Sequence, residues 1–315
     1  MCAIASFWKT ISADLTPLVF HPLYVAADVP ATHRFPMGKY RAVAEELVRS
    51  GAVASMEAYH QPILAPEAWL TLAHDADYVS GVLGQTLDAA TQRRIGFKVT
   101  KFIEHRTRHS VAGTVLAARL ALEHGLAGNL AGGSHHALPG GGAGFCVFND
   151  VGVTGKLLLM EGSVSKILIV DLDVHQGDGT AKIFAQDKRA FTFSLHCEKN
   201  WPRRKIASDL DIGLEDGTGD DAYLRVLADT LPGLIAQERP DLVFYNAGVD
   251  PHREDRLGLL DLSDEGLAKR EAYVINTVKR AGVPLCVVMG GGYSRDVDAL
   301  AMRHALAFAE VVRAV

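Results

Sequence analysis

The segment Asp171-Leu-Asp173-Val-His175 places two carboxylates and an imidazole at alternate positions, where the apolar run 166–171 ends. Because side chains alternate along a strand, all three would face the same side. Burying these groups together without a cation would cost a great deal of free energy. Carboxylates and imidazoles are common ligands of divalent metals. The spacing therefore predicts half of a metal site, although not a reaction, and the alternative of a solvated loop fits the apolar run poorly.

A third acidic group follows another apolar run, which begins at position 241 and ends in Asn-Ala-Gly-Val-Asp250. Asp250 is therefore the candidate third ligand. The alternative is an ordinary turn aspartate before Pro251. Two carboxylates and one imidazole leave coordination positions open, which is typical of a catalytic rather than a structural metal site.

Two adjacent histidines, His135 and His136, lie in the glycine-rich segment 132–144. Imidazole is the side chain best suited to exchanging protons near neutral pH, so the pair predicts acid/base groups beside the metal. The alternative is a pair of exposed loop residues. The glycines do not form the G-x-G-x-x-G pattern, because Phe145 falls where the last glycine is required, and a dinucleotide site is therefore excluded.

Tyr293 follows three consecutive glycines at positions 290–292. Glycines allow the backbone to approach a site closely. A tyrosine hydroxyl opposite a metal could donate a hydrogen bond to an oxyanion. Taken alone, the motif is weak, and a turn with a packed tyrosine is its default interpretation.

Short apolar runs and longer amphipathic segments must position these groups. The runs are typical of strands buried on both faces and cover 166–171, 190–195, 241–245 and 284–289. The amphipathic segments predict helices over 107–124, 220–238 and 263–281, with a kink or break at Pro232. This alternation indicates an α/β fold, an open parallel sheet with helices on both faces. Ligands of such sheets bind off the carboxyl ends of the strands, where all these polar groups lie.

The composition limits the classes of function. With 48% apolar and 22% charged residues, the chain is expected to fold around a buried core. No linker or repeat divides it, so one domain over 1–315 is predicted. The net charge of −5 and the absence of a basic block argue against direct nucleic-acid binding.

The cysteines and the N-terminal segment bear on the location of the protein. Cys2, Cys146, Cys197 and Cys286 are scattered without a C-x-x-C pair, which suits a reducing compartment. Lys9 and Asp14 interrupt any signal-peptide pattern, and no apolar run reaches membrane-spanning length. We therefore expect a cytoplasmic protein without a membrane partner.

Taken in order, these segments resemble the histone deacetylase family, which includes acetoin-utilisation proteins and acetylpolyamine amidohydrolases. The matching segments are HPLY from His21, HRFPMGKY from His33, GGSHHA, GFCVFND, DLDVHQGDGT, FSLH, AGVD and GGGY. They span nearly the whole chain. The HRFPM segment and Asn200-Trp-Pro look closest to the class IV-like, largely bacterial branch. The resemblance implies a three-layer, arginase-like α/β domain.

The resemblance also implies a role for each site residue. Zinc, or ferrous iron as an alternative, would be bound by Asp173, His175 and Asp250. The tandem histidines would be oriented by carboxylates, with Asp171 beside His135 and Asp178 beside His136. His136 would be the general base and acid, and Tyr293 would hydrogen-bond the substrate carbonyl.

Two further features are implied by the resemblance alone. A structural potassium ion would lie near Asp171, Asp173, His175, Ser194 and Leu195. Gly144, Phe145 and Trp201 would wall a narrow channel for an aliphatic amine arm.

The function predicted is that of a metal-dependent amidohydrolase that removes acetyl or longer acyl groups from lysine side chains of proteins. One alternative is a deacetylase of small acylated amines such as acetylpolyamines, although the loop insertion typical of those enzymes is not evident. Another is a binding protein without activity, which the complete set of ligands, histidines and tyrosine disfavours. An arginase would need more acidic ligands for its two metals.

Other polar residues are interpreted as structural. The basic segment 101–109, with His105 and His109, is expected to be a solvated helix face. Cys146 is expected to pack beneath the site, and His196 and Cys197 to fill space. His252 is expected to line the rim rather than to bind metal.

Overall fold

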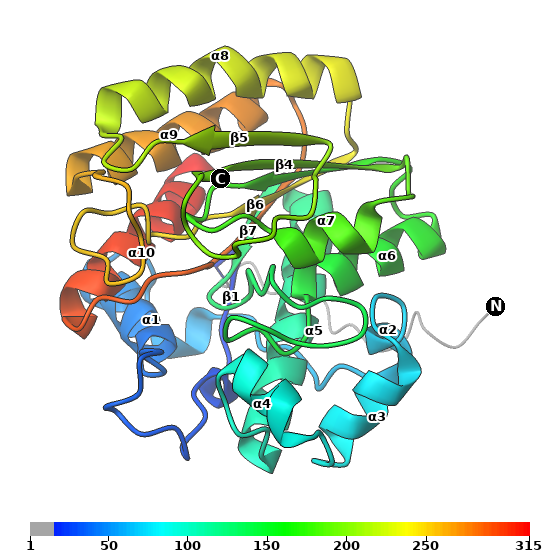
Figure 1. Cartoon of the computed structure of the whole chain (residues 1–315). Coiled ribbons are helices and arrows are strands. Elements are labelled where there is room, and N and C mark those ends of the chain that lie inside the picture. The colour runs from blue at the N-terminus through cyan, green and yellow to red at the C-terminus, as the bar shows by residue number, and fades with distance from the viewer. Residues whose placement is uncertain (1–15) are drawn as a thin grey trace.

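A computed structural model describes residues 16–315, which form an open sheet of seven strands (Figure 1). Every pair of neighbouring strands is parallel, in the order β1-β2-β7-β6-β3-β4-β5. The strands are β1 Leu18–Val19, β2 Leu126–Asn129, β3 Ile167–Asp171, β4 Ala190–Cys197, β5 Leu210–Leu214, β6 Leu242–Asn246 and β7 Leu285–Val288. Cys2, Lys9 and Asp14, which entered the predictions above, lie outside the described residues.

Helices cover both faces of this sheet (Figure 1). The α-helices are α1 Lys39–Arg49, α2 Glu67–Leu70, α3 Ala76–Leu83, α4 Ala89–Ile95, α5 Lys101–His124, α6 Asp150–Glu161, α7 Asp178–Phe184, α8 Asp220–Glu238, α9 Asp264–Arg280 and α10 Val297–Ala314. Side chains alternate along each central strand between two core clusters: Ile167 and Ile169 pack towards α5, α6 and α7, whereas Leu168 and Val170 pack towards α1, α8, α9 and α10. The predicted α/β fold with a parallel sheet between two layers of helices is therefore confirmed.

The predicted central strands are confirmed to within about two residues at each end, because long runs of buried apolar side chains mark them clearly. β1, β2 and β5 carry no such signal in the sequence. β1 has only two residues, and β5 lies at the edge of the sheet, where its side chains are only partly buried.

The basic segment 101–109 was wrongly expected to be a solvated face. Helix α5 begins at Lys101, where the Thr100 hydroxyl accepts a hydrogen bond from the Ile103 amide, and its first turns are partly buried. Arg106 is 4% exposed and donates to the Tyr40 hydroxyl, and Glu104 is buried beside Arg108. His109 is buried as well, and His105 is half-buried. The charged side chains find partners far away in the sequence, which periodicity alone could not reveal.

Of the kink or break predicted at Pro232, the break is wrong, because α8 runs without interruption from Asp220 to Glu238, and the kink stays a prediction. A proline inside a helix leaves the carbonyl four residues earlier without its hydrogen-bond donor. Here that carbonyl belongs to Ala228, and the Tyr273 hydroxyl of α9 donates to it at 3.4 Å. The neighbouring helix therefore supplies the donor that the proline lacks.

Across the residues that the structure describes, no helix combines the length and apolar character needed to cross a bilayer.

Candidate active site

The polar groups singled out in the sequence meet at one edge of the sheet, off the carboxyl ends of four adjacent strands. β2, β7, β6 and β3 are neighbours, and each is followed by one of the motifs. The histidines follow β2, the aspartate–histidine segment follows β3, Asp250 follows β6, and Tyr293 follows β7. The chain order of these motifs therefore differs from their order in space, which the sheet topology sets.

Asp173, His175 and Asp250 form a buried group that could hold a metal ion. Within residues 16–315, one ligand atom from each lies within 4.8 Å of those of the others. The Nδ1 atom of His175 lies 3.0 Å from Oδ1 of Asp173 and 3.1 Å from Oδ2 of Asp250. Backbone amides fix both carboxylates: Gly291 donates to Asp173 at 2.7 Å, and Val174 donates to Asp250 at 2.9 Å.

The electrostatics of this group favour a cation. Burial, together with repulsion from Asp173, raises the pKa of Asp250 to about 7. Burial alone would lower the pKa of His175, but hydrogen bonds and charge from Asp173 and Asp250 raise it to about 10. The two buried carboxylates therefore attract positive charge, and a donor set of two carboxylates and one imidazole fits a divalent ion such as zinc or ferrous iron.

Two histidine–carboxylate pairs lie beside the metal-ligand group. The Nδ1 atom of His135 is 2.7 Å from Asp171, and that of His136 is 2.7 Å from Asp178. The two imidazole rings are 4.0 Å apart, and both are buried. Since a carboxylate only accepts hydrogen bonds, the Nδ1 atom of each histidine carries a proton, and Nε2 remains as the other ring nitrogen.

The two histidines differ in charge. Burial opposes the charged form of His135, but Asp171 and Asp173 outweigh it and raise the pKa to about 9. For His136, burial and the charge of His135 lower the pKa to about 4, against the opposing effect of Asp178. His136 is therefore neutral at pH 7 and able to accept a proton, next to a cationic His135.

Tyr293 closes the site on the side of β7. Its ring centroid lies 6.1 Å from that of His175, and its backbone amide donates to Asp255 at 2.7 Å. Burial, with repulsion from Asp173 and Asp250, raises the pKa of Tyr293 well above 10, so the phenol keeps its proton. The hydroxyl is thus a permanent hydrogen-bond donor near the metal-ligand group.

Several residues that support this geometry were missed by sequence reasoning. Asn246, the last residue of β6, donates to Asp171 at 2.8 Å. Lys39 is fully buried and donates to the carbonyls of Gly290 and Gly292, at 3.0 and 3.3 Å. Asn246 could have been found, because it ends an apolar run as Asp171 does. Lys39 carried no signal beyond its place in the HRFPMGKY segment.

A hollow of about 430 Å³ leads to His136, His175 and Tyr293. The three predicted channel residues line it: Gly144, Phe145 and Trp201. Trp201 stands edge-on to His136, with ring centroids 4.5 Å apart. The lining also carries the cationic side chains of Arg34 and Lys199, and none of its residues is acidic.

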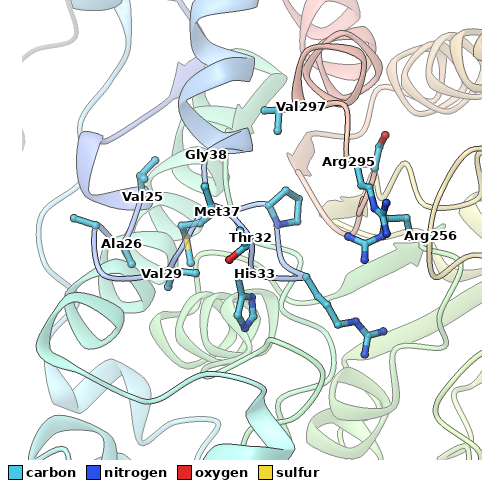
Figure 2. Close-up of a pocket in the computed structure, with 15 residues that line it drawn as sticks. Val25, Ala26, Val29, Thr32, His33, Met37, Gly38, Arg256, Arg295 and Val297 are labelled. Carbon is cyan, nitrogen blue, oxygen red and sulfur yellow. The ribbon is translucent and has the colours of Figure 1, made fainter.

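Two further hollows adjoin the site. One, of only about 20 Å³, lies behind the metal-ligand group and is lined by aromatic and polar side chains, among them Phe35, Tyr40 and Arg106. The other, of about 550 Å³, lies on the surface next to Arg34. Figure 2 shows Arg256 and Arg295 on one side of this second hollow and Val25 and Val29 on the opposite side.

The residues expected to be structural lie largely as predicted. Cys146 is buried and lines the small hollow behind the site. His252, which was expected to line the rim, is instead buried, 3.3 Å from Asp264. His196 is buried and contacts the Ser194 hydroxyl at 2.9 Å. Ser194 lies opposite Asp171 in the pairing of β3 with β4, and Leu195 is the next residue of the same strand.

Comparison with known proteins identifies the family. Residues 33–309 match the histone deacetylase domain. The chain is 50% identical over 290 residues to an uncharacterized protein of Picosynechococcus, covering 92% of this chain and 96% of that one. It is 31% identical to histone deacetylase 2 of Arabidopsis thaliana, covering 84% and 70% of the two chains. It is 28% identical to the acetoin utilization protein AcuC of Staphylococcus aureus, covering 85% and 76%.

The fold points in the same direction. The crystal structure of the HDA15 HD domain superposes with a TM-score of 0.76, at 21% identity, over 95% of this chain and 89% of that one. At this identity the likeness shows the shared fold alone. Together with the domain match over most of the sequence, it confirms the resemblance inferred from the motifs. The chain belongs to the histone deacetylase family, whose members are deacetylase hydrolases.

Proposed function

We propose that this protein is a metal-dependent amidohydrolase that removes acetyl groups from lysine side chains. The observation that carries the proposal is the buried group of Asp173, His175 and Asp250 beside two histidine–carboxylate pairs. The same edge of the sheet supplies ligands for an ion, a neutral base and a phenol donor. These are the parts that hydrolysis of an amide requires.

Asp173, His175 and Asp250 would hold the ion. When bound, a divalent ion supplies Lewis acidity, polarising the amide carbonyl and lowering the pKa of water to about 7. The one imidazole and two carboxylates leave positions open for substrate and water. Zinc is the ion that we propose, with ferrous iron as the alternative that the same donors accept.

The chain's own residues would carry the protons and the developing charge. His136 accepts the proton of the attacking water through Nε2, while Asp178 holds Nδ1. It then delivers that proton to the nitrogen of the leaving lysine. His135, kept cationic by Asp171, and the hydroxyl of Tyr293 stabilise the negative charge that develops on the carbonyl oxygen.

The space behind the ligand group favours a short acyl chain. That hollow holds about 20 Å³, close to the space of one water-sized probe. Phe35, Tyr40 and Arg106 fill the room that a longer chain would need. An acetyl methyl group fits with small adjustments, whereas an octanoyl chain requires these side chains to move. We therefore propose acetyl rather than long-chain acyl groups as the substrate.

The entrance favours acetyl-lysine over an acetylated polyamine. A polyamine carries further ammonium groups beyond the acylated nitrogen. The hollow that receives it contains Arg34 and Lys199 and no acidic side chain, so those ammonium groups would meet like charges. Acetyl-lysine is neutral along its whole arm, and the walls formed by Phe145 and Trp201 suit an aliphatic chain.

The remaining site features are proposals of the same kind. We infer a structural potassium ion near Asp171, Asp173, His175, Ser194 and Leu195. The pairing of Asp171 with Ser194 supports it, because it brings oxygen atoms of adjacent strands together. We also infer a single catalytic domain over 1–315 and a cytoplasmic location, which the free cysteines Cys146, Cys197 and Cys286 support.

The proposal is tested by hydrolysis of a substrate panel. The chain is stripped with a chelator, and zinc or ferrous iron is added back. Acetyl-, trifluoroacetyl-, octanoyl- and myristoyl-lysine peptides are compared with acetylated polyamines. We expect metal-restored turnover that is fastest on the acetyl and trifluoroacetyl peptides. Asp250→Asn, which keeps the volume of the side chain, is the matched control and should remain inactive with either metal.

Other outcomes would change the proposal. Faster turnover of acetylated polyamines would assign the site to small amines instead. Preference for the octanoyl or myristoyl peptides would contradict the argument from the small hollow. A folded chain that hydrolyses nothing with either metal would favour a binding protein built on this fold.

A further inference from the structure

A fully buried ion pair lies behind the metal-ligand group, outside the mechanism described above. Arg270 and Glu271 are adjacent residues of α9, and both are 0% exposed. The guanidinium donates to Oε1 of Glu271 through two nitrogens, at 2.5 and 3.1 Å. Charged side chains of this kind are almost never fully buried unless they are paired.

The same guanidinium bridges the two loops that carry the metal-ligand carboxylates. Arg270 donates to the carbonyl of Leu172 at 3.2 Å and to that of Gly248 at 2.8 Å. Leu172 directly precedes Asp173, and Gly248 lies two residues before Asp250. One side chain of α9 therefore holds the backbone next to both carboxylate ligands.

These contacts begin where the sheet stops. The pairing of β3 with β6 ends at Asp171 opposite Asn246, followed by one last hydrogen bond from the Leu172 amide to the Asn246 carbonyl. Beyond that point, the fork of guanidinium donors takes the place of strand pairing. The two loops touch there, since a Cβ atom on Gly248 would lie only 2.5 Å from Oδ2 of Asp173.

Glu271 and Tyr245 fix the orientation of the guanidinium. The Tyr245 hydroxyl, on β6, donates to Oε2 of Glu271 at 2.5 Å, so Arg270 and Tyr245 hold the two carboxylate oxygens from different sides. A buried ion pair is weak evidence for stability, because apolar residues of the same volume often stabilise a fold as well or better. Stability alone therefore does not explain this network, whereas its position next to both loops that carry the metal-ligand carboxylates suggests a role for it.

We propose that Arg270 is a positioning residue for the metal site, holding the loops of Asp173 and Asp250 at the separation that binding a divalent ion requires. The inference rests on the proposed function, since it assumes that these carboxylates bind a metal. Glu271 neutralises the guanidinium, which would otherwise repel the ion, and Tyr245 locks that carboxylate in place. Weakening any link of this network lowers metal affinity.

The test measures metal affinity directly on the full-length chain. Cobalt(II) is the probe, with its dissociation constant obtained by competition with a chelator and its site geometry read from the visible absorption band. Arg270→Lys keeps the charge but loses the planar fork, and we expect about 10- to 100-fold weaker cobalt binding, the usual effect of losing a residue that orients metal ligands. The absorption band should also change in intensity or position.

The matched control lies one turn further along the same helix. Val274 is fully buried in the core, and its aliphatic side chain cannot hydrogen-bond to the ligand loops. Val274→Ala should therefore lower thermal stability without altering cobalt affinity. Tyr245→Phe is a second, milder probe that serves if Arg270→Lys fails to fold. It should weaken cobalt binding by a smaller factor than Arg270→Lys.

The outcomes separate the two proposals. Wild-type cobalt affinity and an unchanged band in Arg270→Lys, or in Tyr245→Phe where the first variant does not fold, would overturn the positioning role. If the wild-type chain itself binds no cobalt, the proposed function fails and this inference falls with it.

Discussion

Replacing Tyr293 with phenylalanine removes one hydroxyl and nothing else from the site. Among the described residues, the hydrogen bond of Tyr293 is made by its backbone amide, to Asp255, and not by its hydroxyl. The loss of the hydroxyl should therefore change the free energy of unfolding by less than about 1 kcal/mol. Loss of one donor to an oxyanion typically lowers turnover about 10²- to 10³-fold, or about 2.7–4 kcal/mol. We expect Tyr293→Phe to lose activity on that scale while keeping its fold and its metal.

The assay compares kcat and KM on an acetyl-lysine peptide, with metal content and thermal unfolding measured on the same preparations. Because the hydroxyl acts on charge that develops during the reaction, kcat should fall while KM changes little. A variant with near-wild-type turnover would refute the role of Tyr293. A variant that lost its metal or unfolded early would refute the statement that the hydroxyl has no structural partner.

Three further predictions follow from the geometry. Asp178→Asn should cost about 10- to 100-fold in kcat, because it removes the carboxylate that orients His136 and raises its pKa; an unchanged rate and pH profile would contradict this pairing. Phe35→Val should enlarge the hollow behind the ligand group and shift the ratio of octanoyl- to acetyl-lysine hydrolysis upwards by at least about tenfold, and an unchanged ratio would show that Phe35 does not limit chain length. Burial lowers the pKa of Lys39 to about 8, from 10.5. Between these two pH values the unfolded chain binds more protons than the folded chain. The free energy of unfolding should therefore rise with pH in this range, by up to about 3 kcal/mol. Urea unfolding of wild type and Lys39→Met at pH 8 and pH 10 checks this, and parallel pH curves for the two proteins would contradict it.

Groups at the ends of the long central strands were predictable from the sequence. The apolar runs of β3 and β6 predict where each strand stops, and Asp173, His175 and Asp250 follow directly. The structure brings these residues together as expected. The tandem histidines were found because they lie among glycines at another strand end.

Groups that depend on packing could not be predicted in this way. Lys39 is 251 residues from the Gly290 carbonyl that it contacts, and Arg106 is 66 residues from the Tyr40 hydroxyl. A lone basic residue is most often solvated, so the sequence around Lys39 or Arg106 predicts an exposed side chain. Arg270 belongs to the same class, since its partners are the carbonyls of Leu172 and Gly248, in the loops that follow β3 and β6.

We propose that one divalent ion, bound by Asp173, His175 and Asp250, supports deacetylation. The most direct test titrates the chelator-stripped chain with zinc while hydrolysis of an acetyl-lysine peptide is followed. We predict that activity rises from near zero and reaches a plateau at one ion per chain, and that Asp250→Asn shows no such rise. Full activity in the stripped chain, or a titration without effect on a folded chain, would contradict the role of the ion.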